Sequence, residues 1–488
     1  MTYIKPSPTS LNTGRVVKRF DKHPPSDKDD GVRIVESQLE LDTLMSYITT
    51  DHMVVDATCV DVDKHCLNNS TSLLFFYFIA SETYWCLPIK HHETIVMPDS
   101  LSKVREPLKR SKHKKYVMNK KNMVQLLGED YGFLDISLLR YFDDGTIDEN
   151  EYKTNAHDFV ERNFRAIPNT NMCVPFYKHA RSFYDKVDAF KKTNVTDSNE
   201  TGFIFVNNTM TNCFARLEAN GLCVNDDFTD EFGLEQSKHI KGNLIFSQYN
   251  FLTSTGRPSN RYGGVNYAAL PKDDNSRNCF VSRHGDDGML VMMDYSAFHP
   301  RLIAHLANFP MAVEDNPYAY LAQYYFDKEL KDINEEDIAV SKGFTFTQIY
   351  GGFDEKWLHI PYFRKVQAYI DHRWKFFNEN GYIETPKYKR KIKPCHIGEA
   401  NPSKLFNYIL QAFETEMAVD VLNELLTLLK GKKTLPVLYT YDSILFDAHK
   451  EDGMETIKRI KDVMEHDKFP VKVSVGKSYK DMRNVTLS

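Results

Sequence analysis

Hydrophobic residues in the first third of the chain occur in short runs separated by polar positions. Three successive runs are rich in Val, Phe, Tyr and Trp, which is typical of consecutive strands. Helical spacing follows at 119–132, where the pattern ends at a glycine, and again at 135–142. We therefore expect an α/β domain over about 33–190. The three predicted strands are 52–63, 72–80 and 83–89.

The remaining chain divides by composition. Residues 1–32 are polar and rich in Pro, Ser, Asp and Lys, which predicts a mobile N-terminal arm. Residues 191–202 form a polar connector, and 203–488 mix long helices with hairpin-like strands. A second, larger α+β domain is expected there.

Two acids stand at the ends of apolar runs. Asp294 follows Val291-Met292-Met293, which predicts a short buried strand, and Asp442 lies at the expected turn of a hairpin over 435–447. A carboxylate at the tip of a buried strand is costly unless a metal, a cation or a backbone cap accompanies it. Each acid alone is more often a turn or cap residue, whereas two such acids together suit a two-metal site.

A third segment, 334–352, is expected to be a helix. It opens with Asn and three acids and closes at glycines, as helix ends favour. Lys342, Phe346 and Tyr350 fall at i, i+4 and i+8 and so share one face. The two rings alone could belong to a core, but a lysine in the same stripe favours a triphosphate, a sugar or a base as ligand.

Composition narrows the class of protein. The 488 residues are 42% hydrophobic and 26% charged, which is typical of a globular protein. We find no long apolar run and no basic-then-apolar start, so neither a membrane span nor a signal peptide is expected. The eight cysteines are scattered, which favours a reduced, intracellular setting. Net charge is −5, yet 103–115 and 387–393 are strongly basic, as solvated surface or as phosphate-binding patches.

The three segments resemble motifs A, B and C of the A family of DNA polymerases, in the same order. Together with other matching segments they cover nearly all of 210–488. The resemblance implies a right-hand polymerase domain at 253–488, comprising a palm and fingers (about 315–385). The additional segments are 253–271 (T-x-T-G-R-x-S, then N-x-x-x-x-P), 405–422 (Asn407 and Gln411 on a helix) and 469–482 (the closing strand).

The resemblance implies a role for each matching residue. Asp294 and Asp442 would hold two Mg²⁺ ions, with the Tyr295 carbonyl as a further ligand. Lys342 would neutralise the phosphates of the incoming nucleotide and could protonate the leaving pyrophosphate. Phe346 would pack on the sugar, and Tyr350 would flank the nascent base pair. The residues expected to contact the minor groove near the primer end are Arg257, Asn407 and Gln411.

The implied activity is template-directed, primer-dependent DNA synthesis from dNTPs on primer-template DNA. His299 stands where the family usually has Glu and would exclude ribose from the 2′ side. Ser443 replaces a usual Glu, Tyr441 a usual His, and Ile338 an arginine that contacts phosphate in relatives. Serine at the position of Ser443 also occurs in single-subunit RNA polymerases. Such a polymerase is one alternative function, but Phe346 favours deoxynucleotides as substrates. A non-catalytic nucleic-acid-binding factor is the other alternative.

The N-terminal domain (33–190) resembles a 3′–5′ exonuclease domain of the RNase H-like class. Asp61 and Asp63 match its D-x-E opening, with Asp for Glu, but Met123 occupies the second acid position. Because a two-metal site needs those carboxylates, the resemblance implies a degenerate domain with little or no proofreading. The third motif is Tyr177 with Arg181 or, in a shifted alignment, Tyr184 with Asp188.

Residues 191–252 are expected to form a linker and a shortened thumb. The segment 213–225 resembles the helix that leads into the family's thumb, and few residues then remain before Thr253. Fewer phosphate contacts predict weak, salt-sensitive synthesis, so a processivity or replisome protein, or the basic stretch 103–121, would supply additional grip. The compact size is typical of a phage or mobile-element replicase, which would act in the cytoplasm of a bacterial host.

Overall fold

The structure, a computed structural model, describes most of the chain and divides it into two compact units. One unit comprises Met1–Arg140 with Asp148–Phe183, and the other Tyr141–Ile147 with Tyr184–Ser488. The predicted arm at 1–32 and part of the connector lie outside the described residues. The described residues are 33–61, 64–91, 95–145, 188, 198–233, 238–260, 265–271, 275–352, 354–465 and 469–487.

The first unit contains a six-stranded mixed sheet in the order β1-β4-β3-β2-β5-β6. The strands β2, β3 and β4 are successively antiparallel, whereas β5 is parallel to β2 and β6 is parallel to β5. The three strands expected from the sequence are therefore present, at slightly shorter bounds. The strands are β1 (Arg33–Ile34), β2 (Met53–Cys59), β3 (Thr71–Phe78), β4 (Thr83–Pro88), β5 (Lys115–Val117) and β6 (Phe133–Asp135).

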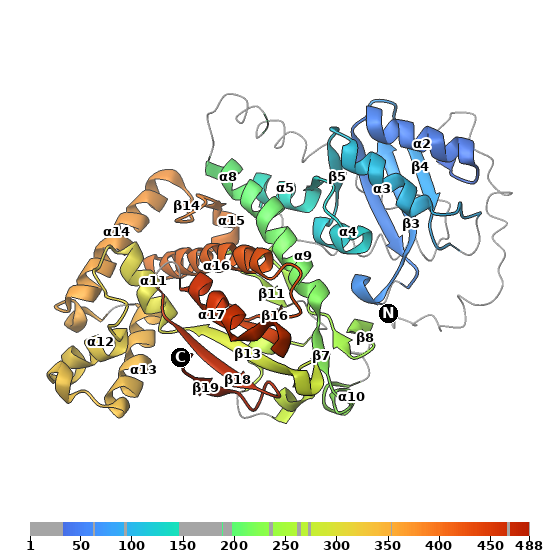
Figure 1. Cartoon of the computed structure of the whole chain (residues 1–488). Helices are drawn as coiled ribbons and strands as arrows, with labels where there is room; N and C mark the ends of the chain where they lie inside the picture. Colours follow the sequence, from blue (N-terminus) through green and yellow to red (C-terminus); the bar gives the residue numbers. More distant parts are fainter. Residues whose placement is uncertain are drawn as a thin grey trace, which may run out of the picture. The chain divides into compact units, whose positions relative to one another are not determined.

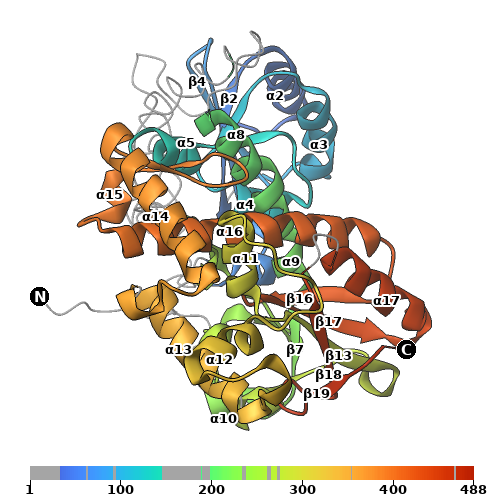
Figure 2. The same ribbon diagram turned by 90° about the vertical axis from the view of Figure 1, so that its left-hand side faces the viewer.

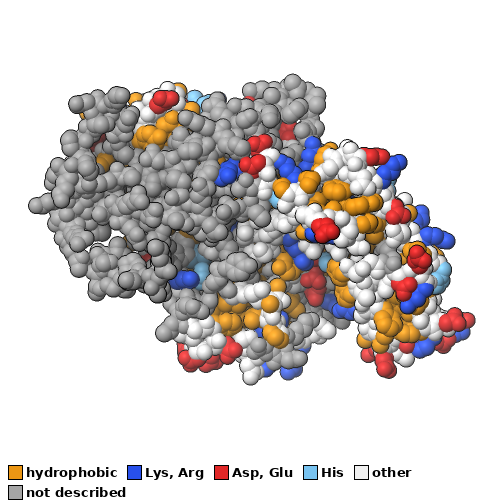
Figure 3. Space-filling model, turned by 180° about the vertical axis from the view of Figure 1, so that it is seen from behind, with side chains coloured by type: hydrophobic (Ala, Val, Ile, Leu, Met, Phe, Trp, Pro, Cys, Tyr) orange, Lys and Arg blue, Asp and Glu red, His pale blue; other side chains and the backbone are white. Residues whose placement is uncertain are grey.

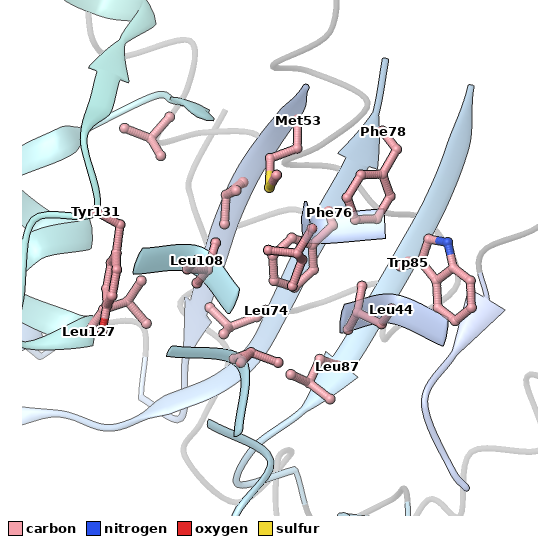
Figure 4. Close-up of a cluster of buried hydrophobic side chains, with 14 of the residues drawn as sticks. Leu44, Met53, Leu74, Phe76, Phe78, Trp85, Leu87, Leu108, Leu127 and Tyr131 are labelled. Atoms are coloured by element: carbon pink, nitrogen blue, oxygen red, sulfur yellow. The ribbon is translucent and has the colours of Figure 1, made fainter. Parts of the chain in front are cut away.

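The core of this unit lies between one face of the sheet and the helices α2 (Gln38–Thr50) and α3 (Ser100–Arg110). Leu74, Phe76 and Phe78 alternate along β3 toward this core, as Figure 4 shows, while Phe75 packs on the opposite face. All eight residues of β3 are buried. The continuous apolar run of β3 follows from burial on both faces of the sheet.

The helix expected at 119–132 is α4 (Lys120–Leu127), which ends earlier than predicted. Gly128 adopts a left-handed conformation with φ of +82° and closes the helix at its C-cap. The helix expected at 135–142 is α5 (Ile136–Asp143). A local glycine thus determines where α4 ends.

The second unit contains a five-stranded antiparallel sheet in the order β16-β17-β13-β18-β19 (Figure 1). β13 lies at its centre and pairs with β17 on one side and β18 on the other. The strand predicted at 291–293 is longer than expected because both of its edges are paired. The strands are β13 (Gly288–Tyr295), β16 (Leu435–Tyr439), β17 (Ser443–His449), β18 (Val471–Gly476) and β19 (Arg483–Val485).

A long buried helix, α16 (Pro402–Leu428), connects the parts of this unit. It contacts α9 (Thr211–Asn220), α11 (Phe298–Leu306) and α17 (Gly453–Met464), and it also packs on β16. The helices α12 (Pro317–Phe326), α13 (Glu335–Gly351) and α14 (Pro361–Asn380) form a helical segment beside it, as Figure 2 shows. Among the helices that the structure describes, none combines the length and apolar character needed to cross a bilayer.

Asp135, at the end of β6, is buried and accepts backbone hydrogen bonds from Lys120 (2.8 Å), Ser137 (2.8 Å) and Leu138 (3.2 Å). Burial nevertheless raises the pKa of this carboxyl from 3.8 to about 6. The folded state therefore holds the proton more tightly than the unfolded chain. The resulting contribution to stability is fully present below the unfolded pKa and is lost as pH rises through about 6.

We expect the first unit to lose stability over this pH interval in the native chain and to lose less of it in Asp135→Asn. Urea unfolding followed by Trp85 fluorescence, in a chain with Trp357 and Trp374 replaced by Phe, measures this unit. Asp99→Asn is the matched control, because Asp99 is exposed and Asn tolerates its left-handed backbone. Equal pH slopes in the Asp135 and Asp99 variants would contradict the assignment.

Candidate active site

The two predicted acids lie at the same end of two adjacent strands of the central sheet, Asp294 on β13 and Asp442 in the turn just before β17. Asp294 of β13 is the register partner of Ser443, the residue that follows Asp442. The Tyr295 backbone N–H donates to the Asp442 carbonyl at 3.0 Å. Because paired residues of antiparallel strands have Cα atoms about 4.5–5.5 Å apart, the fold brings both acids to one end of the sheet.

The turn before Asp442 has an unusual backbone. Tyr441 has a φ of +67°, which costs a non-glycine residue about 1 kcal/mol or more. The turn is closed by the Thr440 N–H, which donates to the Ser443 carbonyl at 2.9 Å, and the Tyr441 ring lies 3.6 Å from the Arg257 guanidinium carbon. These contacts hold the backbone that presents Asp442.

Negative charge accumulates around the acids. Burial by surrounding protein, followed by the charge of Glu414, raises the pKa of Asp442. Part of the Asp442 residue nevertheless remains exposed to solvent. Burial also raises the pKa of Tyr479, to which the charges of Asp294 and Asp442 both contribute while Arg277 opposes them. Both carboxylates therefore lie within electrostatic reach of one phenol, an environment that favours a bound cation.

Tyr295 contributes to this site through its backbone. Its ring is buried and stacks on Phe298 at 4.3 Å, and its hydroxyl donates to the Met464 carbonyl at 3.0 Å. The side chain is therefore committed to the core beneath the sheet. The main-chain carbonyl is the group that this residue can present to a ligand.

The helix α13 carries two adjacent stripes of side chains, one buried and one largely exposed. A capping box between Asn334 and Asp337 begins the helix, and a buried stripe packs against α12. The adjacent stripe carries Lys342, Phe346 and Tyr350, of which Lys342 and Tyr350 are exposed and Phe346 is half-buried. The Phe346 and Tyr350 rings stack at 5.8 Å, and the Lys342 Nζ lies 5.8 Å from the Phe346 centroid. The buried stripe is Ser341, Thr345 and Ile349.

His299, at the start of α11, connects α13 to α16. Its Nδ1 is hydrogen-bonded to the Tyr350 hydroxyl, and its Nε2 lies 2.9 Å from Glu414 Oε1. The other oxygen of Glu414 lies 2.8 Å from Arg257 Nη2. Glu414 was not predicted from the sequence, although Asn407, Gln411 and Glu414 are spaced along one face of a helix, a signal that could have found it.

The three predicted minor-groove residues are also brought together. Asn407 donates to the Tyr350 carbonyl at 3.4 Å, and the Thr255 hydroxyl donates to the Gln411 amide oxygen at 3.4 Å. Arg257 joins them through Glu414, which lies on the same helix. The structure thus places all the predicted polymerase residues around one region of the second unit.

A buried arginine holds the loop that carries Arg257. The Arg390 guanidinium donates to the Thr255 carbonyl and, at 2.8 Å, to the Tyr141 hydroxyl. Arg390 belongs to the basic stretch 387–393, which the sequence allows to be either solvated surface or a phosphate-binding patch. Within this stretch, Lys387 also pairs with Asp420 at 2.6 Å, so part of that charge serves internal contacts rather than a free binding surface.

The predicted exonuclease residues are divided between the two units. Asp61 lies beyond the end of β2 in the first unit, where it pairs with Lys64 at 3.3 Å, and Asp188 belongs to the second unit. β2 itself carries another acid, Asp56, which is buried. Met123 packs in the hydrophobic core. Asp63, Tyr177, Arg181 and Tyr184 lie outside the described residues.

One face of the molecule shows how charge and apolar surface are distributed. In Figure 3, lysines, arginines and acids are interspersed with hydrophobic side chains wherever the surface is coloured. Exposed apolar residues of the helical segment include Leu330, Val340 and Phe344. The coloured part of this face therefore carries charges of both signs.

The central sheet, α16 and the helical segment define the fold of a DNA polymerase domain. In particular, the chain is similar to the polymerase domain of Pol1 from M. smegmatis, solved in complex with DNA primer-template and dNTP. The TM-score is 0.70, with 92% of this chain and 99% of that chain covered. The sequences are 14% identical, so this likeness confirms the predicted polymerase fold with mixed α/β content. No family model matches the sequence.

Gly256, next to Arg257, has a φ of +72°, and an added Cβ would lie 2.7 Å from Arg390 Nη2. We expect Gly256→Ala to lower the free energy of unfolding by more than about 1 kcal/mol and to loosen the loop. Gly343→Ala is the control: no atom lies within 4 Å of its Cβ position in α13, so alanine should stabilise that helix by roughly 0.5–1 kcal/mol. Urea unfolding and amide exchange over 253–257 measure both effects; unchanged exchange in Gly256→Ala would refute the clash.

Proposed function

We propose that the chain is a template-directed, primer-dependent DNA polymerase of the A-family type. The observation that carries this proposal is the pairing of β13 with β17, which brings Asp294 and the turn residue Asp442 to one end of the sheet in a fold similar to a polymerase domain. The residues of α13, His299 and the minor-groove set surround the same region. The activity proposed is addition of a deoxynucleotide to a DNA 3′ end with release of pyrophosphate.

The donor set suits two Mg²⁺ ions. Mg²⁺ typically takes one or two carboxylates and completes its coordination with waters and substrate phosphates. Asp294 and Asp442 supply two carboxylates, and the Tyr295 carbonyl a third oxygen. Among the described residues, no group of three or more His, Cys, Asp or Glu side chains could hold a metal. When bound, such ions activate the primer hydroxyl and stabilise the charge on the transferred phosphate.

The side chains of the protein would then position the reactants. The exposed ammonium of Lys342 can contact the triphosphate, and Phe346 offers a flat surface to the sugar. Tyr350 would lie beside the nascent pair, with His299 against the 2′ position. The primer 3′-hydroxyl attacks the α-phosphate in line, and the leaving pyrophosphate receives a proton from Lys342. Positioning and fixed charge account for most of the rate in such a site.

Arg257, Asn407 and Gln411 are proposed to contact the minor groove of primer-template DNA. Hydrogen-bond acceptors there are similar for all correct base pairs, so these contacts test geometry rather than sequence. In the domain arrangement we propose, 253–488 form the palm and fingers (about 315–385), and 191–252 a linker and short thumb. Between Asn220 and Thr253, the described residues form only short elements such as α10 (Phe228–Phe232). A processivity or replisome protein is the partner that this short region favours.

The first unit is proposed to be a degenerate exonuclease-like domain. Three antiparallel strands followed by two parallel strands, in the order β4-β3-β2-β5-β6, are consistent with an RNase H-like sheet. Met123, 3% exposed in the core, fills the position expected for the second acid. Without that carboxylate, little or no proofreading is proposed.

The RNA polymerase alternative gains no support from Ser443. This residue is buried, and its hydroxyl lies 2.6 Å from the Thr440 hydroxyl across the turn. The serine therefore has a structural explanation in the hairpin. Its presence is not a reason to propose ribonucleotides as substrates.

We expect Asp294→Asn and Asp442→Asn each to lower primer extension by about a thousandfold or more, because each removes several kcal/mol of metal-assisted stabilisation. Extension of a primed template with dNTPs and Mg²⁺ measures the rate. Asp462→Asn is the control, since Asp462 is exposed on α17. Equal rates in the three variants would favour the non-catalytic alternative.

We expect the native chain to leave a mismatched primer terminus intact when dNTPs are omitted and Mg²⁺ is present. Electrophoresis of an end-labelled primer detects loss of the terminal nucleotide. If the mismatch is removed rapidly, Asp56→Asn distinguishes the source: loss of the activity in that variant assigns it to β2 and refutes the degenerate domain.

A further inference from the structure

Glu414 is a charged residue placed almost completely inside the protein. It lies on α16 and is 1% exposed. An isolated carboxylate is strongly disfavoured in such a position unless it is paired. Each of its oxygens has one cationic or polar partner, His299 Nε2 at 2.9 Å and Arg257 Nη2 at 2.8 Å.

The carboxylate determines which nitrogen of His299 carries a proton. A carboxylate only accepts hydrogen bonds, so Nε2 must donate to it. In the neutral ring Nδ1 is then the acceptor, and it accepts the hydroxyl of Tyr350. Glu414 thus sets both the tautomer of the ring and its orientation.

The same carboxylate connects four segments that are distant in sequence. Through His299 it reaches the start of α11, and through the Tyr350 hydroxyl it reaches the last turn of α13. Through Arg257 it reaches the loop at 253–257 and, by the stacking of Arg257 on Tyr441, the turn that presents Asp442. A change in the Glu414 carboxylate therefore alters the position of His299, the residue proposed to lie beside the nucleotide sugar.

We propose that Glu414 is a positioning residue that sets the selection against ribonucleotides, by holding the His299 ring rigid against the 2′ position. The proposal rests on the proposed polymerase function and deepens it. In this proposal the His299 ring blocks the 2′ position, and Glu414 prevents the ring from rotating away from it. No contact between Glu414 and the nucleotide is required.

Glu414→Gln tests this role with little change of volume. Glutamine carries no charge and has a single acceptor oxygen, so it cannot both accept from His299 Nε2 and neutralise the Arg257 guanidinium. The matched control is Glu424→Gln, the same exchange on the same helix. Glu424 is exposed, whereas Glu414 is buried against His299 and Arg257.

The measurement is kcat/KM for single dNTP and rNTP incorporation on a primed template. We expect Glu414→Gln to lower the dNTP/rNTP ratio by about tenfold or more, as loss of a charged hydrogen bond implies. The ratio for Glu424→Gln should stay within about twofold of the native value, since substitutions at exposed positions away from the site usually have small effects. Glu414→Asp, which keeps the charge but shortens its reach, gives a second variant should Glu414→Gln fail to fold, and it should also lower the ratio.

A double variant identifies the route of the effect. If Glu414 acts through His299, the ratio for His299→Gln should not fall further when Glu414→Gln is added. A native-like ratio in both Glu414 variants, or full additivity in the double variant, overturns the proposal. A native chain that fails to incorporate dNTPs would instead overturn the proposed function, so the two failures are distinguishable.

Discussion

The antiparallel pairing of β13 with β17 is the constraint on which the candidate site depends. It aligns Asp294 with Ser443 and so places Asp442 beside the end of the central strand. Because β13 is also paired with β18, the strand cannot shift without breaking bonds on both sides. A slip of one residue would turn Asp294 to the opposite face of the sheet. The pairing register is therefore as necessary for the site as the two acids themselves.

Two buried charges extend this constraint into the surrounding loops. Arg390 holds the backbone before Arg257, and Glu414 holds Arg257 and His299 together. Breaking a buried pair leaves an uncompensated charge, which is far more costly than loss of a surface pair. The geometry around the acids therefore depends on interior charges contributed by α16 and by the basic stretch 387–393. Each of these charges is remote in sequence from the residue it holds.

Features encoded by local patterns were predictable from the sequence. The β17 hairpin, the face of α13 with Lys342, and the early strands all follow from periodicity and capping. Features that depend on tertiary partners were not. The role of Glu414 depends on contacts with His299 and Arg257, which are distant in sequence. Arg390 lies in a basic stretch that the sequence alone does not distinguish from a surface patch. For the exonuclease motif, the resemblance assigns Asp61, which follows the end of β2, while the strand itself carries Asp56.

A crystal structure with primer-template DNA, a non-hydrolysable dNTP analogue and Mn²⁺ is the most direct test of the central claim. Anomalous scattering would locate the ions independently of the protein density. The account predicts two peaks roughly 3.5–4 Å apart, bridged by the carboxylates of Asp294 and Asp442 and touching the triphosphate. Ions bound elsewhere, or carboxylates that point away from an ordered nucleotide, would contradict it.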